Sequence, residues 1–214
     1  MCRLLYVNSK NKFSVPEYLS KFAEISKNSK EFQGHGWGCA YLIDGNWKYY
    51  KNVKPIWEDD LSRFENSNRL IAHARSAFKD EGIVVENNMP FYDDKNIFIF
   101  NGELRGVKIK EEGRIGAEKI FNYIKRFDKG SIKDALQKGA NIINKKTNYI
   151  RAMNIIMTDE HAAYIYSQFS EEPEYFTLNV KSNDKTVVVC SDPFAGENDW
   201  MSIQNKSLTE YKCF

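Results

Sequence analysis

The sequence predicts an α+β fold in which strands and helices form separate layers. Strand-like apolar runs predominate before residue 102 and again after residue 148, and two stretches with helical spacing lie between them, at 115–127 and 132–143. This order differs from the strict strand–helix alternation of a doubly wound sheet and favours an α+β arrangement. No internal repeat or Pro/Gly-rich linker divides the 214 residues, so we expect a single domain over 1–214.

The first elements are a strand and a helix. The run CRLLYV begins at residue 2 and is rich in strand formers. Ser14, Pro16 and Glu17 have the spacing of an N-cap, an early-turn proline and a capping box, which predicts a helix to about Ser26.

Strand signals then dominate. The runs GWGCAYLI and NWKYYK flank Asp44-Gly45, a strong hairpin signal, and RLIAHAR and NIFIFN are two further apolar strands. A short helix is expected at 57–66, between the hairpin and RLIAHAR. The last third predicts strands at 149–158, 161–169, 174–180 and 185–190, with a turn at 158–160.

Composition argues for a small-molecule partner. The 31 basic residues nearly cancel the 29 acidic ones, which leaves a net charge of +2 and no large basic field for nucleic acid. No apolar run approaches the ~20 residues that span a bilayer, and no signal-peptide pattern begins the chain. We therefore expect no nucleic-acid partner, no membrane association and a cytoplasmic location.

The four cysteines give no metal or disulfide pattern. Cys2, Cys39, Cys190 and Cys213 are widely separated, without a CxxC pair or a nearby histidine at ligand spacing. Cys39 and Cys190 lie within apolar strand-like runs, where cysteine usually acts as a small core residue. We expect no metal and no cofactor.

Cys2 is the unusual cysteine, because removal of Met1 would place a thiol and a free α-amine on one residue. The α-amine has a reference pKa near 8, so a usable fraction is unprotonated at neutral pH and can accept the thiol proton. Nucleophile and base would then come together without a separate histidine. Position alone is weak evidence, since any residue can follow Met1.

Three other residues supply what acyl transfer from an amide also needs. Arg75 ends the strand RLIAHAR, where its guanidinium could bind a carboxylate, although a structural ion pair is the ordinary role of such an arginine. Asn101 and Gly102 end the run NIFIF, where a side-chain amide and a backbone N–H could stabilise an oxyanion, although Asn-Gly is more often a turn. His73 is expected to be a packed, hydrogen-bonded residue without a catalytic role.

Together these residues resemble the landmarks of class II glutamine amidotransferases, above all the stand-alone members of that family, which lack a synthase domain. The matching segments occur in the family's order over almost the whole chain: Met1-Cys2-Arg3-Leu4-Leu5, Gly36-Trp37-Gly38, Ala72-His73-Ala74-Arg75, Pro90-Phe91, Asn101-Gly102, and Ser191-Asp192-Pro193 with Trp200.

The resemblance implies the four-layer αββα sandwich of N-terminal nucleophile hydrolases. It also implies that Cys2 is the nucleophile and its amine the base, that Arg75 binds the α-carboxylate of a γ-glutamyl group, and that Asn101 and Gly102 form the oxyanion hole.

The chain departs from the family at two positions that bear on the substrate. Family members that use glutamine carry an aspartate for the substrate α-ammonium where this chain has Gly116, within Ile115-Gly116-Ala117-Glu118. Glu118 matches a helix-face or capping residue of the family. Phe78 replaces a threonine-type polar contact. These differences favour a γ-glutamyl peptide or conjugate over free glutamine.

Two other classes of function remain open. One is a non-catalytic domain of the same fold that binds a small molecule or a protein, and the other is an N-terminal nucleophile amidase for non-glutamyl amides. Arg75 argues against the second, because an acyl-amide pocket would be apolar. An ammonia-accepting partner enzyme and homo-oligomer formation are also left open.

Overall fold

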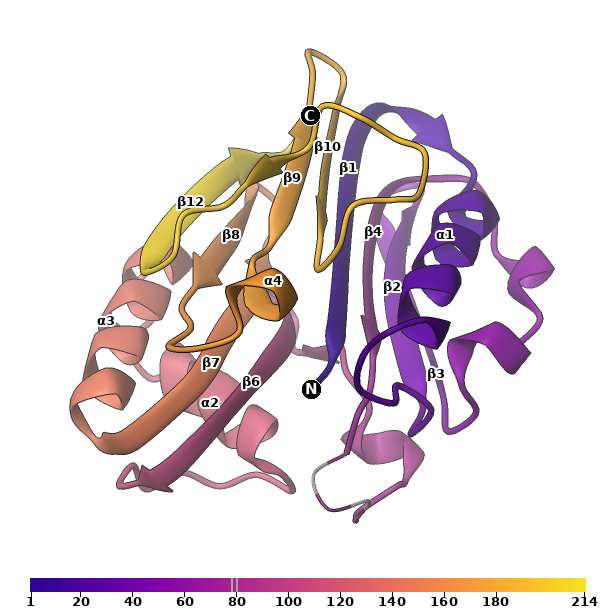
Figure 1. Ribbon diagram of the computed structural model, residues 1–214. Coiled ribbons are helices and arrows are strands. Elements are labelled where there is room, and N and C mark those ends of the chain that lie inside the picture. Colours follow the sequence, from indigo (N-terminus) through magenta and orange to yellow (C-terminus); the bar gives the residue numbers. More distant parts are fainter. Residues whose placement is uncertain (78, 80) are drawn as a thin grey trace.

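Two antiparallel β-sheets stack face to face in the computed structural model, with helices on their outer faces (Figure 1). The structure describes residues 1–77, 79 and 81–214. The layers therefore follow the order helix, sheet, sheet, helix, and the predicted αββα arrangement is confirmed.

The first sheet has seven strands in the order β11-β9-β10-β1-β4-β2-β3. Its central strand β1 pairs with β10 on one side and with β4 on the other, both antiparallel. The strand bounds are β1 Arg3–Phe13, β2 Trp37–Ile43, β3 Asn46–Asn52, β4 Ser67–Ala74, β9 Asn179–Ser182, β10 Thr186–Cys190 and β11 Met201–Ser202.

The second sheet has five strands in the order β12-β8-β7-β6-β5. Its longest pairing joins β6 to β7 and places Asn101 opposite Asn154. The strand bounds are β5 Phe91–Tyr92, β6 Ile97–Val107, β7 Thr147–Thr158, β8 Ala162–Ser167 and β12 Ser207–Lys212.

The helices cover the outer faces of the two sheets. Helix α1, Val15–Lys27, lies against the seven-stranded sheet, while α2, Gly116–Lys125, and α3, Ile132–Lys145, lie against the other sheet (Figure 1). Ser14 caps α1 by accepting a hydrogen bond from the Glu17 N–H, as its sequence predicts. A short helix α4, Pro173–Phe176, follows β8.

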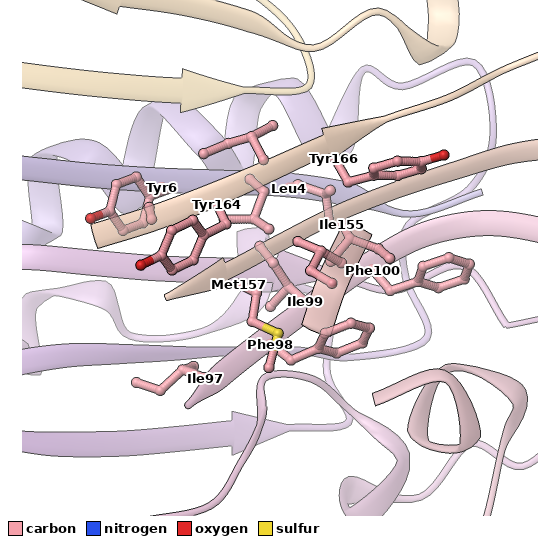
Figure 2. Close-up of a cluster of buried hydrophobic side chains, with 14 of the residues drawn as sticks. Leu4, Tyr6, Ile97, Phe98, Ile99, Phe100, Ile155, Met157, Tyr164 and Tyr166 are labelled. Carbon is pink, nitrogen blue, oxygen red and sulfur yellow. The ribbon is translucent and has the colours of Figure 1, made fainter. Parts of the chain in front are cut away.

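Alternation along β1 divides the core into two layers. Leu5 and Val7 pack with residues of α1, whereas Leu4 and Tyr6 point to the other sheet. Figure 2 shows Leu4 and Tyr6 in one cluster with Ile99 of β6. Even-numbered residues of β1 therefore face the gap between the sheets.

Most predicted elements form, with three corrections. Residues 57–66 hold no continuous helix but parts of two 3-10 turns, Ile56–Glu58 and Leu61–Arg63, because extended backbone at Asp59 ends the first turn and Asp60 caps the second. Residues 174–176 belong to α4 rather than to a strand, since Pro173 begins a helical turn there. The hairpin forms as predicted, with Asp44 and Gly45 at positive φ.

The third correction concerns Asn101 and Gly102. The apolar run ends at Phe100, but β6 continues to Val107 because its partner β7 extends to Thr147. Asn101 and Gly102 are therefore inside a strand and do not form a turn. No helix of the described residues is long and apolar enough to cross a membrane.

Candidate active site

Cys2 and Arg75 are neighbours across the pairing of β1 with β4. The register places Arg3 opposite Ala74 and Leu4 opposite His73, so Cys2 comes next to Arg75. On its other side, the Arg75 N–H donates to the Gly36 carbonyl at 2.9 Å and extends the pairing of β4 with β2 by one residue. Cys2 shares the parity of Leu4, which directs its side chain to the gap between the sheets.

Asn101 approaches the same gap from the other sheet. Odd-numbered residues at this part of β6 face the seven-stranded sheet, since Phe98 stacks on Phe121 of α2 at a centroid distance of 5.1 Å. Strand β6 contacts both β1 and β4. Asn101 is 1% exposed, and its Oδ1 has no hydrogen-bond partner among the described residues.

Gly102 is held where a side chain could not fit. A Cβ at this position would lie 2.3 Å from the Ala152 carbonyl oxygen and 2.4 Å from the Phe100 ring. Beyond Phe98, β6 pairs with β7 alone, because Phe98 pairs with Phe91, the first residue of the antiparallel strand β5. Along this edge of β6, every second backbone N–H therefore lacks a strand partner among the described residues. A backbone N–H that binds an oxyanion must be free of such a partner.

Met1 occupies a well-defined place beside Cys2. Its carbonyl oxygen accepts hydrogen bonds from Gln33 Nε2 at 2.6 Å and from Tyr175 Oη at 2.7 Å, and its ammonium group forms an ion pair with Glu31. The Met1 side chain packs against a small apolar cluster that includes Phe176. Figure 1 places this N-terminus between the two sheets, next to β6.

Burial raises the pKa of the Cys2 thiol, while the nearby Met1 amine and Arg75 oppose that rise. The thiol donates a weak hydrogen bond to the Ser76 carbonyl oxygen at 3.7 Å. The thiol is therefore protonated at neutral pH and needs a base before it can attack a substrate.

Arg75 is a buried cation held by neutral groups. It is 5% exposed, and its Nη1 donates to the Gly82 carbonyl at 2.9 Å and to Asn88 Oδ1 at 3.3 Å. Among the described residues no carboxylate pairs with it. Within the described part of the chain, hydrogen bonds to neutral groups therefore hold Arg75, and its guanidinium retains N–H groups for a carboxylate.

His73 is packed, as expected. Its side chain is fully buried and interacts with the Phe100 backbone, although neither ring nitrogen makes a well-formed hydrogen bond to the described residues. Burial lowers the pKa of His73 to about 3, so the imidazole is neutral at physiological pH.

The two departures from the family pattern have different outcomes. Gly116 is the first residue of α2 and has no side chain that could bind an ammonium group. A side chain would fit at this position, because a Cβ there would meet nothing within 4 Å. Glu118 accepts from the Arg114 N–H at 2.6 Å and is a local capping residue. Phe78 lies outside the described residues.

The remaining cysteines and cavities do not belong to this cluster. Cys39 and Cys190 are fully buried core residues, as predicted, and burial raises the pKa of Cys190 to about 12. A cavity of about 480 Å³ lies beside Lys51 and Arg114, and its lining includes none of the predicted site residues. No metal-binding group occurs among the described residues.

Comparison with solved structures identifies the fold. The glutamine phosphoribosylpyrophosphate amidotransferase from B. subtilis matches 99% of this chain with a TM-score of 0.70 and 14% identity. A predicted glutamine amidotransferase from Pseudomonas aeruginosa matches with a TM-score of 0.64 and 13% identity, and a glutamine aminotransferase class-II domain protein from Silicibacter pomeroyi with 0.61 and 13%. Each covers 99% of this chain.

The chain therefore has the fold of class II glutamine amidotransferase domains, within the N-terminal nucleophile hydrolase architecture. It spans 49% of the B. subtilis protein but 97% of the Pseudomonas and 99% of the Silicibacter protein. No family model and no curated protein matches the sequence.

Sequence reasoning missed the groups around Met1. Glu31, Gln33 and Tyr175 come from a loop after α1 and from α4, more than 140 residues apart. No motif or spacing connects these segments, so only the folded chain brings them together.

Proposed function

We propose that the protein is an amidohydrolase that cleaves a γ-glutamyl amide through an N-terminal cysteine thioester, after removal of Met1. The observation that carries this proposal is the convergence of Cys2, Arg75 and Asn101 on the gap between the sheets, from three strands that are far apart in sequence. Packing alone does not require these three groups to face one space: a thiol, an arginine with no carboxylate partner among the described residues, and a buried asparagine whose Oδ1 has no hydrogen-bond partner there.

The mechanism begins with proton transfer within one residue. The free α-amine of processed Cys2 accepts the thiol proton, and the thiolate attacks the side-chain amide carbon of the substrate. Asn101 and the Gly102 N–H stabilise the oxyanion that forms. The α-ammonium group then protonates the departing amine, and water hydrolyses the γ-glutamyl thioester.

Arg75 supports a substrate that carries a carboxylate. Arg75 is buried and has no carboxylate partner among the described residues, so a carboxylate that binds to it stabilises the guanidinium and gives a γ-glutamyl group an advantage over a neutral acyl amide. Released amine or ammonia enters solvent in this proposal. A partner enzyme that accepts ammonia is the second candidate, because related proteins of similar fold include an amidotransferase about twice this length.

Hydrolysis of γ-glutamyl-p-nitroanilide and of glutamine by the wild type and by Cys2→Ala tests the proposal. We expect p-nitroaniline release by the wild type and none by Cys2→Ala, with glutamine hydrolysed more slowly than γ-glutamyl peptides. Cys213→Ala is the matched control, because it removes a half-buried thiol outside the site. Equal activity of Cys2→Ala and the wild type would exclude Cys2 as the nucleophile.

A further inference from the structure

Glu31 and its partners form a carboxylate-rich network beside Cys2. Arg151 lies at the centre of this network, 3.1 Å from Glu31 and 3.3 Å from both Glu103 and Glu171, and it also contacts Glu172. Lys30 pairs with Glu172, and Arg105 pairs with Glu103.

The ammonium group of Met1 balances the charge of this network. Among the described residues, four glutamates meet three side-chain cations, and the Met1 ammonium group on Glu31 is the fourth cation. Loss of Met1 therefore leaves the Glu31 carboxylate facing the nucleophile without its ammonium partner. A half-buried carboxylate in this position attracts another cation.

After Met1 is removed, the α-amine of Cys2 cannot replace the Met1 ammonium group as the cation beside Glu31 when the enzyme is ready to react. It must be neutral to accept the thiol proton, so it cannot at that moment supply the missing positive charge. The Met1 nitrogen is three bonds from the Cys2 nitrogen, so Glu31 marks an ammonium-binding position close to the place where the substrate amide must bind.

The γ-glutamyl group has the matching charges. Its α-ammonium nitrogen is four bonds from the reacting carbonyl carbon, a reach of roughly 5 Å with bonds near 1.5 Å. Its α-carboxylate lies on the same carbon as the ammonium group. Arg75 and Glu31 are a cation and an anion close enough to the Cys2 thiol to affect its pKa, which Arg75 lowers and Glu31 raises.

We propose that Glu31 binds the α-ammonium group of the substrate while Arg75 binds its α-carboxylate. This inference rests on the proposed γ-glutamyl chemistry at Cys2 and assigns the ammonium partner that Gly116 does not supply. It predicts a substrate with a free α-amino group, and it makes Glu31 a determinant of specificity.

Paired substrates test this assignment. The processed wild type is assayed with γ-glutamyl-p-nitroanilide and with glutaryl-p-nitroanilide, which lacks only the α-amino group. We expect the wild type to prefer the γ-glutamyl compound by roughly 10- to 100-fold in kcat/KM, the range for a hydrogen bond between charged groups. Glu31→Gln should lose most of this preference and cleave the glutaryl compound as the wild type does.

Glu171→Gln is the matched control, because it removes another carboxylate from Arg151 without touching Met1 or Cys2. It should retain the wild-type preference. A wild type that cleaves both compounds equally well overturns the role of Glu31, whatever the variants do, and so does a Glu31→Gln enzyme that loses the same factor on both. Cleavage of neither compound, with no labelling of Cys2 by a γ-glutamyl diazoketone, overturns the proposed function itself.

Discussion

Asn101 and Asn154 face each other across β6 and β7, and they allow catalysis and stability to be separated. Asn154 donates to the Phe176 carbonyl at 2.7 Å and accepts from Ser167 Oγ at 3.2 Å and from the Gln168 N–H at 3.1 Å. Asn101 makes no such bonds among the described residues, although it is equally buried.

Replacement of each by alanine should have opposite consequences. Asn101→Ala removes an oxyanion donor, which typically costs about 3–4 kcal/mol in the transition state, or roughly two to three orders of magnitude in kcat. Its stability should change little, because an unpaired buried oxygen leaves with the side chain. Asn154→Ala leaves two buried backbone groups without partners, at about 1–3 kcal/mol each in the free energy of unfolding.

The assays are p-nitroaniline release from γ-glutamyl-p-nitroanilide and unfolding in urea, both performed on the two variants and the wild type. The reasoning is refuted if Asn101→Ala keeps wild-type kcat, or if its stability falls as far as that of Asn154→Ala. Either result would mean that the Asn101 side-chain N–H groups do not donate to the oxyanion.

Three further results are expected. Gly102→Ala should lower the free energy of unfolding by about 1–3 kcal/mol through its clash with Ala152, whereas Gly116→Ala, which enters open space, should be neutral or slightly stabilising; equal urea midpoints would contradict this. Between pH 6.5 and the folded-state pKa of about 3, His73 binds a proton in the unfolded chain but not in the folded chain, so this residue makes unfolding easier as pH falls, by at most about 1.4 kcal/mol per unit. His73→Leu should weaken this dependence in urea titrations at pH 7 and 5, and an unchanged slope excludes it. Intact mass should show Met1 absent from active protein, because a retained Met1 blocks the amine.

Local sequence signals predicted the elements well where one interaction decides the outcome. Ser14 caps α1 and Asp44-Gly45 forms the hairpin, since capping and positive φ are properties of a few adjacent residues. The same reasoning misplaced Asn101 and Gly102 at a strand end, because hydrophobicity reports burial and β6 continues beyond its buried half.

The part of the site that depends on strand positions was predictable from the sequence. Cys2 and Arg75 follow from their positions at the ends of strands, and the register of β1 with β4 brings them together. The environment of Met1 was not predictable, because Glu31, Gln33 and Tyr175 meet only through tertiary packing. The partner of His73 was not predictable either, because the Phe100 backbone that it approaches belongs to the other sheet.

Labelling with a γ-glutamyl diazoketone, followed by peptide mass spectrometry, tests the central claim most directly. The claim predicts one label per chain, on the thiol of an N-terminal peptide that begins at Cys2, with no label on Cys2→Ala. A label on Cys39, Cys190 or Cys213, or a labelled peptide that still begins with Met1, would contradict it.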